Sequence, residues 1–296
     1  MVRVERIDEK SHVLILDNVR ACWLIRDRRN VLIESGIPAD VPSLKQGLSE
    51  LGMTAGDIDV VALTHVHVDH AGGAAYLARQ NPAMRVCAHA EGTRHLVNPV
   101  KLVESVRRAY GGKFSAVGEM AALPSRKMVR TVGSGDCIDL GATRLEVYDT
   151  PGHAKHHVVY FDRRGGTLYA GDALGSRYPG LPNFVLSPPS DYDKELAQQS
   201  IDLIARLNPR RIIFTHCGPW DFDADGDFYD TLKNKHDLWT RVLADVIRAD
   251  PGIERRLLLD RFLERLPELK QYPDQFFSFN LSVNGIYIYL KRAGLI

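Results

Sequence analysis

Short apolar runs separated by polar turns dominate the first sixty residues. Runs rich in β-branched side chains occupy residues 13–16, 21–25 and 30–34, with only a few polar residues between them. This spacing is typical of antiparallel strands joined by hairpins. A helical pattern follows at 42–51, and a further apolar run at 59–63 predicts another strand.

The middle of the chain alternates between strand-like and helix-like patterns. Helices are expected at residues 71–80, from 91 to about 123, and at 193–207, and strands at 85–88, 144–148, 157–161, 167–170 and 211–215. A proline-containing stretch without regular spacing lies at 175–191. The order is therefore β-rich, βα, β-rich and αβ. Two sheets packed face to face with helices outside satisfy that order, which predicts an α/β fold.

The pattern changes after Trp220. An acidic stretch at 221–230 precedes almost continuous helical spacing up to residue 296. We expect one domain over residues 1–225 and a helical appendage over residues 226–296. Core packing or a homodimer contact is the expected role of the last helix, because the appendage carries too small a basic excess to indicate a nucleic-acid reader.

Composition narrows the class of protein. The 296 residues are 45% hydrophobic and 25% charged, as in globular proteins with a substantial core. The formal net charge of +1 gives no overall attraction to nucleic acid or to acidic membranes. No apolar run is long enough to predict a membrane span, and the N-terminus lacks the apolar segment of a signal peptide, so a cytoplasmic location is the default expectation. The four cysteines form no CxxC pair and are interpreted as reduced thiols.

Four side chains that can bind metal fall within six positions: His65, His67, Asp69 and His70. Imidazole nitrogen and carboxylate oxygen are ligands that zinc, iron and manganese accept. In an extended segment residues two apart point the same way, so His65 and His67 can reach one metal. A turn after them would direct Asp69 and His70 toward a second metal. So many ligands exceed any packing need of an ordinary polar loop.

Further ligands are expected at the ends of other predicted strands. His153 follows Thr150-Pro151-Gly152, Asp172 follows Ala170-Gly171, and His216 follows Thr215. Taken alone, each residue fits an ordinary loop histidine or a capping aspartate. Together with the cluster they supply seven potential ligands at successive strand ends.

In this order the segments resemble the metallo-beta-lactamase superfamily. The resemblance rests on Thr64-His65-Val66-His67-Val68-Asp69-His70-Ala71-Gly72-Gly73 and on the three later segments ending at His153, Asp172 and His216. It covers roughly residues 10–220 and implies a four-layer αβ/βα sandwich with metals at one edge, which makes 1–225 the catalytic domain. By motif position, His65, His67 and His153 would bind the first metal, Asp69, His70 and His216 the second, and Asp172 would bridge both.

The branch indicated is glyoxalase II-like, because Thr150-Pro151-Gly152-His153 is similar to the corresponding segment of those thioesterases. Asp172 stands where several antibiotic hydrolases carry cysteine, so a true β-lactamase is not expected. Two divalent ions, with zinc expected and iron or manganese also accepted, would turn a shared water into hydroxide that attacks a small ester, thioester or lactone. Asp69 would orient that hydroxide as the catalytic residue, His157 would support a ligand by a hydrogen bond, and Tyr178 would line the substrate cleft.

Two alternatives of the same fold stay open. One is a mononuclear-iron persulfide dioxygenase that uses His65, His153 and Asp172. The other is a nucleic-acid-processing phosphodiesterase that uses the helical tail. The expected partner is otherwise a small-molecule substrate.

Overall fold

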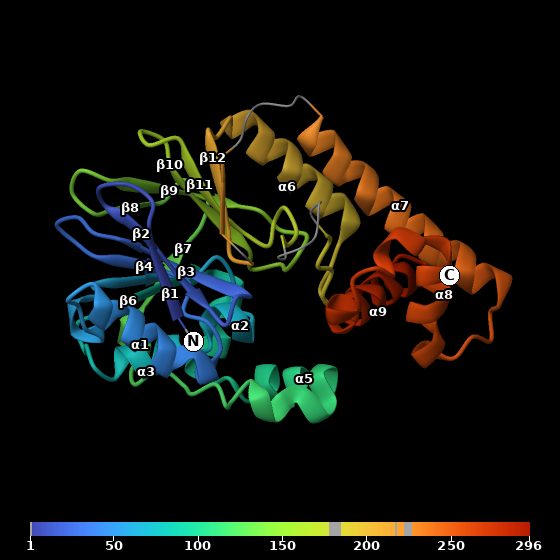
Figure 1. The fold of residues 1–296 in the computed structure, drawn as a ribbon, viewed down its shortest axis with the longest axis horizontal. Helices are drawn as coiled ribbons and strands as arrows, with labels where there is room; N and C mark the ends of the chain where they lie inside the picture. The colour runs from blue at the N-terminus through green and yellow to red at the C-terminus, as the bar shows by residue number, and fades with distance from the viewer. Residues whose placement is uncertain (1, 178–184, 217, 222–226) are drawn as a thin grey trace.

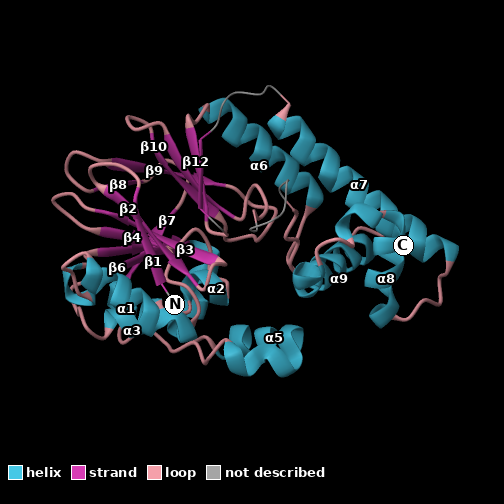
Figure 2. Cartoon of the chain, in the orientation of Figure 1, coloured by secondary structure: helices cyan, strands magenta, loops and turns pink. Residues whose placement is uncertain are grey.

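The computed structural model describes residues 2–177, 185–216 and 227–296, and the backbone of residues 218–221. Within these residues two β-sheets lie face to face, and helices cover their outer sides (Figure 1). Figure 2 shows the strands of both sheets in the left half of the view, with the helices α6 to α9 (residues 194–292) on the right. The predicted αβ/βα sandwich with a C-terminal helical region is confirmed.

The first sheet combines an antiparallel and a parallel half. Its strands, in spatial order, are β1 (Val2–Arg6), β2 (Ser11–Leu16), β3 (Arg20–Ile25), β4 (Val31–Ile33), β5 (Val60–Ala62), β6 (Arg85–His89) and β7 (Val129–Val132). The strands β1 to β4 pair as antiparallel hairpins, of which β2 to β4 were predicted. The strands β4 to β7 pair in parallel, so helices must cross over between them.

The second sheet has the spatial order β13-β12-β11-β10-β9-β8. Its strands are β8 (Cys137–Asp139), β9 (Arg144–Asp149), β10 (Val158–Asp162), β11 (Thr167–Gly171), β12 (Arg211–Phe214) and β13 (Gly218–Asp221). The pair β11 and β12 is parallel, and helix α6 (Lys194–Leu207) makes the connection.

The remaining helices lie in two groups. Those that follow strands of the first sheet are α1 (Val41–Glu50), α2 (Val68–Ala71), α3 (Ala74–Ala78), α4 (Ala90–Val97) and α5 (Val100–Tyr110). Those near the C-terminus are α7 (Phe228–Ala249), α8 (Leu258–Arg265) and α9 (Phe276–Arg292). Short 3-10 helices are η1 (Pro38–Asp40), η2 (Ala55–Asp57), η3 (Gly111–Ala116), η4 (Arg126–Met128), η5 (Arg255–Leu257), η6 (Pro267–Leu269) and η7 (Pro273–Gln275).

Alternation along the strands builds two separate cores. On β2, Val13 and Ile15 belong to the core between the sheets, while Leu14 and Leu16 belong to the core under the outer helices. Successive side chains of a strand point to opposite faces, so an entirely apolar strand serves both cores. This explains why the first strands appear in the sequence as continuous apolar runs.

Some sequence predictions were wrong in their extent. The predicted helix from 91 to about 123 is interrupted at Asn98 and Pro99 and ends at Ala116. The predicted helix at 71–80 begins earlier, at Val68, and is divided in two. At the division a Cβ on Gly73 would lie 2.2 Å from the carbonyl oxygen of Ser35, so only glycine fits there.

The C-terminal helices share a core with the main body. Val185, Leu186 and Tyr192 pack in one apolar cluster with Trp239 of α7 and Phe279 of α9. The expected boundary at residue 225 stays a prediction, as does the homodimer contact. Within the described part of the chain, no helix is both long and apolar enough to cross a membrane.

Candidate metal centre

All seven predicted ligand side chains come together at one edge of the sandwich. His65, Asp172 and His216 follow the strands β5, β11 and β12, and His153 lies in the loop between β9 and β10. His67, Asp69 and His70 lie at the start of α2. Three overlapping groups have their donor atoms within 4.8 Å of one another: His65, His67 and His153; His65, His70 and Asp172; and Asp69, His70 and His216.

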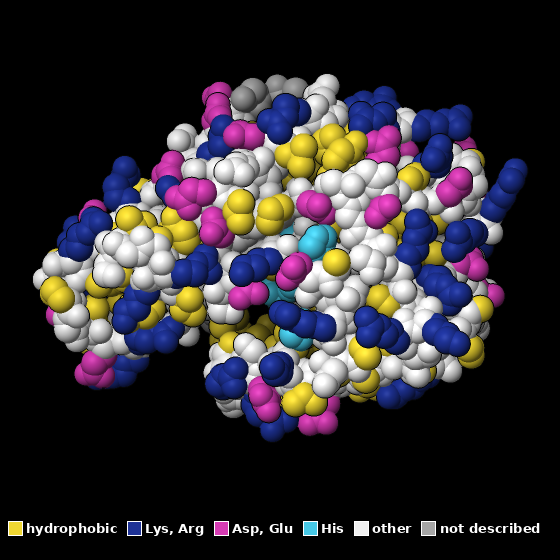
Figure 3. Space-filling model, turned by 180° about the vertical axis from the view of Figure 1, so that it is seen from behind, with side chains coloured by type: hydrophobic (Ala, Val, Ile, Leu, Met, Phe, Trp, Pro, Cys, Tyr) yellow, Lys and Arg dark blue, Asp and Glu magenta, His cyan; other side chains and the backbone are white. Residues whose placement is uncertain are grey.

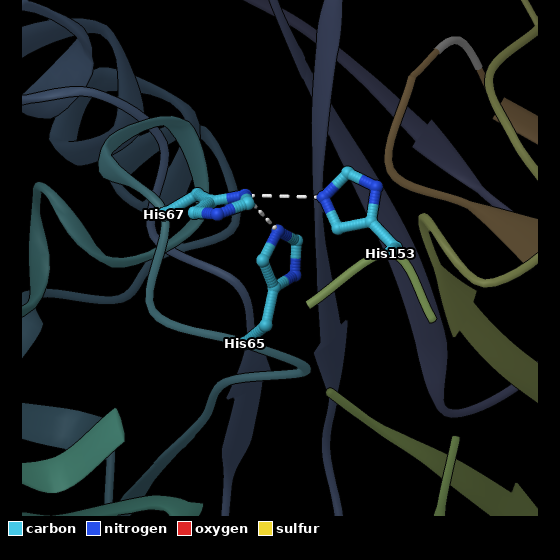
Figure 4. Close-up of side chains that lie close together, drawn as sticks. All are labelled: His65, His67 and His153. Carbon is cyan, nitrogen blue, oxygen red and sulfur yellow. Dashed lines mark hydrogen bonds between the residues drawn. The ribbon is translucent and has the colours of Figure 1, made fainter. Parts of the chain in front are cut away.

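The first donor group consists of three imidazoles around one point. The Nδ1 atom of His67 lies 2.9 Å from Nε2 of His65 and 3.1 Å from Nε2 of His153 (Figure 4). The ring planes of His65 and His67 are nearly perpendicular, at 82°. The three nitrogens therefore converge without stacking the rings, as metal ligation requires.

The second donor group is linked to the first by Asp172. The Oδ2 atom of Asp69 lies 3.6 Å from Nε2 of His216 and 3.7 Å from Nε2 of His70. The Oδ1 atom of Asp172 lies 3.5 Å from the same His216 nitrogen, while its Oδ2 atom lies 3.5 Å from Nε2 of His153. Each oxygen of Asp172 thus faces a different donor group.

In His216 and His65, the hydrogen bond of the ring nitrogen that faces away from the centre determines which nitrogen can bind a metal. Nδ1 of His216 lies 3.2 Å from the carbonyl oxygen of Val19, which can only accept, so Nδ1 carries the proton and Nε2 presents its lone pair to the centre. Thr64 donates its hydroxyl proton to Glu34, so it accepts from Nδ1 of His65 at 3.1 Å. Nε2 of His65 is then also free for a metal.

The electrostatics of the cluster fit divalent cations. Burial lowers the pKa of His65 and His153 well below the usual value, which keeps them neutral, as ligands must be. Burial also lowers the pKa of His70, but the charges of Glu34, Asp69 and Asp172 outweigh it and raise that pKa well above normal. The carboxylates therefore attract positive charge into the cluster. Oδ1 of Asp172 and Nε2 of His70 have no hydrogen-bond partner among the described residues, which a bound cation would explain.

Glu34 is a residue of the candidate site that the sequence analysis missed. Its side chain is 1% exposed, its Oε1 lies 3.2 Å from Nδ1 of His70, and it accepts the Thr64 hydroxyl. The backbone of Glu34 has φ +66°, an uncommon value for a residue with a side chain. A charged residue ending the β-branched run at 30–34, directly before Ser35-Gly36, is the only signal that the sequence offers for it.

His157 lies where a supporting residue was expected. It donates from Nδ1 to Thr150 at 2.8 Å and accepts the backbone N–H of Asp172 at Nε2, at 3.1 Å. Burial lowers its pKa to about 3, so it stays neutral and can accept that bond. Its neighbour His156 accepts a hydrogen bond of 3.2 Å from the backbone N–H of Val66, the residue between His65 and His67. Both histidines therefore position the backbone of segments that contain candidate metal ligands.

Two glycines permit the close approach of these loops. Gly171 has φ +52°, and a Cβ there would lie 2.4 Å from the Thr64 hydroxyl and 2.7 Å from Nε2 of His157. Gly152 has φ +133°, and a Cβ there would lie 2.3 Å from the backbone of Ala197. The Gly171-Asp172 and Gly152-His153 pairs in the sequence therefore reflect packing around the ligands.

A pocket of about 590 Å³ opens onto the donor groups. It is lined by His67, Asp69 and His153, by parts of α4 and α5, and by residues 185–191. Phe277, Leu281 and Ser282 of α9 also line it, which the sequence did not predict. Tyr178, the expected cleft residue, lies outside the described residues. Figure 3 shows histidine side chains within a hollow of this face, with basic, acidic and hydrophobic side chains around it.

The chain is similar to known proteins. A family model described as the metallo-beta-lactamase superfamily matches residues 17–216. A metallo-beta-lactamase fold-containing protein of Sulfurisphaera tokodaii is 28% identical over 165 residues, which cover 54% of this chain and 61% of that protein. A hydroxyacylglutathione hydrolase of Photobacterium profundum is 28% identical over 167 residues, covering 54% of this chain and 51% of the hydrolase. The chain thus spans little more than half the length of these two relatives.

A solved structure matches nearly the whole chain. The metallo-beta-lactamase family protein of Thermus thermophilus aligns with a TM-score of 0.68 at 21% identity, covering 99% of this chain and 93% of that one. This likeness concerns the fold and includes the C-terminal helices. The family model spans more than half of the chain and includes every ligand side chain described above. The chain belongs to the metallo-beta-lactamase superfamily.

Proposed function

We propose that this chain is a hydrolase that uses two divalent metal ions to cleave a small ester, thioester or lactone. The observation that carries the proposal is the position of Asp172, which presents one oxygen to His153 and the other to His216, each at 3.5 Å. A carboxylate shared in this way is what two neighbouring cations require. The proposal agrees with the superfamily, whose members are mostly metal-dependent hydrolases.

The donor set supports zinc as the metal, although the same ligands accept iron or manganese. The first ion would be held by His65, His67 and His153, the second by Asp69, His70 and His216, and both by Asp172. When bound, divalent ions lower the pKa of a water molecule and polarise a carbonyl group.

Asp69 is the residue that we propose to orient the attacking water. Its side chain is 23% exposed and lines the pocket, whereas Asp172 is 5% exposed. Oδ2 of Asp69 is held near His70 and His216, which fixes the carboxylate relative to the second donor group. An oriented carboxylate at the pocket surface can accept a proton from water placed to attack a carbonyl carbon.

The pocket favours a small substrate. Its volume of about 590 Å³ lies in the range usual for small-molecule sites, roughly 300–1,000 Å³. Several relatives are hydroxyacylglutathione hydrolases, which by their name act on hydroxyacylglutathione. We therefore propose thioesters as the first class to test, followed by esters and lactones.

The test is hydrolysis after defined metal loading. The protein is stripped of metal, reloaded with zinc, iron or manganese, and assayed against thioesters, esters and lactones together with oxygen consumption. We expect hydrolysis without oxygen uptake, and Asp69→Ala should lower kcat by at least about a hundredfold. Asp245→Ala, which removes an exposed carboxylate of α7, is the matched control and should leave kcat unchanged. A protein that binds one iron, consumes oxygen and hydrolyses nothing would contradict the proposal.

A further inference from the structure

One wall of the pocket carries positive charges for which the described residues provide no ion pair. Lys101 and Arg108 are seven positions apart on α5, which places them on the same face two turns apart, and Arg94 lies in the last turn of α4. All three line the pocket. Within the described residues, none of them forms an ion pair with a carboxylate. Arg107 on the same helix is different, because it pairs with Glu119 at 3.3 Å and does not line the pocket.

Apolar side chains lie directly beside this charge. Leu102 and Val106 form the adjacent stripe of α5 and also line the pocket. Leu281 and Phe277 of α9 supply further apolar lining. The ring of Phe277 meets the ring of Tyr110 edge-on, with centroids 5.0 Å apart, so α5 and α9 are in contact at this end. The two helices thus enclose a mainly apolar space with a cationic edge.

Few negative charges oppose these cations. Outside the metal centre, Asp191 is the one acidic residue among the described pocket residues. A fourth cation, Arg20, already forms two hydrogen bonds to Asp40, at 2.6 and 2.9 Å. The charge that is available to a ligand is therefore positive, and the apolar walls strengthen its attraction to an anion.

We propose that the substrate is an amphipathic anion. Its anionic group, distal to the bond that is cleaved, binds Arg94, Lys101 and Arg108, and its apolar part lies against Leu102, Val106 and Leu281. The inference deepens the proposed function and rests on it for the identity of the cleaved bond. The anionic group can belong to the acyl part or to the leaving group, and the experiment distinguishes these two sources.

The test compares three octanoyl-length thioesters on the zinc-loaded enzyme. The neutral one is the N-acetylcysteamine thioester of octanoate. The second carries a carboxylate at the far end of the acyl chain, and the third carries phosphate on a phosphopantetheine leaving group. We expect at least one anionic thioester to have a KM about tenfold below that of the neutral one.

Variants of α5 test whether Lys101 and Arg108 cause the preference for anionic thioesters. In the double variant Lys101→Met/Arg108→Met, the ratio of kcat/KM for the preferred anionic thioester to kcat/KM for the neutral thioester should fall about tenfold. Arg107→Met removes the same charge from the same helix and should behave as the wild type. Equal KM values for all three thioesters in the wild type, or an equal fall of that ratio with Arg107→Met, would overturn the proposal.

Direct binding separates this inference from the proposed reaction. Calorimetric titration of the zinc-loaded protein with octanesulfonate should give a Kd that rises about tenfold in the double variant and stays constant in Arg107→Met. If no thioester, ester or lactone is hydrolysed but this dependence is found, the anion site stands and the hydrolase proposal fails. If thioesters are hydrolysed without charge preference and octanesulfonate binds all variants equally, the hydrolase proposal stands and the anion site fails. Circular dichroism confirms that the double variant is folded.

Discussion

The Nδ1 atom of His70 lies 3.2 Å from Oε1 of Glu34, and neither side chain is more than 1% exposed. A buried carboxylate in this position orients the imidazole and increases its basicity toward a metal on the other nitrogen. The same carboxylate accepts the hydroxyl of Thr64, which contacts His65 of the first donor group. One buried charge therefore supports a ligand of each group.

The first prediction concerns this charge. Glu34→Gln keeps the shape of the side chain but removes its charge, and we expect zinc affinity to fall about 10–100-fold, as is usual for residues that support ligands. Competition with a chromophoric chelator measures the affinity. Glu50→Gln, at the exposed end of α1, is the control. Unchanged affinity in a folded Glu34→Gln protein would show that the contact does not serve metal binding.

The second prediction concerns His157, which joins Thr150 to the backbone N–H of Asp172. His157→Phe leaves that N–H buried without an acceptor. We expect the free energy of unfolding of the metal-free protein to fall by about 1–3 kcal/mol. Urea denaturation provides the measurement, and a variant as stable as the wild type would mean that the N–H finds another partner.

The third prediction is a pH dependence that is separate from the ligand cluster. Burial lowers the pKa of His236 to about 4, and its Nδ1 lies 2.6 Å from the Tyr192 hydroxyl. The unfolded chain takes up a proton near pH 6.5, whereas the folded protein does so only near pH 4. The stabilising contribution is therefore complete above pH 6.5 and is lost as the pH falls toward 4.

The difference between the pKa of His236 in the unfolded and the folded protein corresponds to about 3 kcal/mol in the free energy of unfolding. Urea unfolding of the metal-free wild type and of His236→Phe, at about pH 7 and about pH 4.5, measures the effect. The variant should lose less stability between the two pH values, although its stability at neutral pH is lower. Equal losses in the two proteins would exclude His236 as the group responsible.

The fourth prediction concerns the attachment of α9 to the pocket. A Cβ on Gly285 would lie 2.1 Å from the carbonyl oxygen of Pro188 and 2.5 Å from that of Pro189, and both prolines line the pocket. Gly285→Ala should therefore destabilise the protein by about 1–3 kcal/mol. At Gly252 the nearest atom is 3.6 Å away, so Gly252→Ala should change stability much less. Thermal unfolding measures the stability of both variants. If Gly285→Ala is as stable as Gly252→Ala, α9 can shift away from Pro188 without loss of stability.

Local patterns allowed much of the architecture, and the convergence of the seven candidate ligands, to be predicted from the sequence. His65, His67, Asp69 and His70 are adjacent in the chain, and the other three ligands end apolar runs that form strands. The strands β1, β7, β8 and β13 were not predicted. In β1 and β7 most side chains are exposed or only partly buried, so their runs carry no strong apolar signal. Pro99 did signal the break between α4 and α5, but the helical spacing on both sides obscured it.

Contacts between distant segments could not be predicted in the same way. Glu34 meets His70 across 36 positions, and nothing near Glu34 in the sequence indicates a metal centre. Likewise, the apolar stripe of α9 predicts packing but does not reveal that Phe277 and Leu281 face a pocket formed by α5. Such roles depend on the tertiary arrangement of the two sheets and the C-terminal helices.

Metal stoichiometry tests the central claim most directly. The metal-free protein is dialysed against excess zinc, and the bound zinc per chain is measured by mass spectrometry for the wild type, His153→Ala and His216→Ala. We predict two zinc ions in the wild type and one in each variant, because each substitution removes a ligand from a different donor group. One zinc ion or none in the wild type would contradict the account.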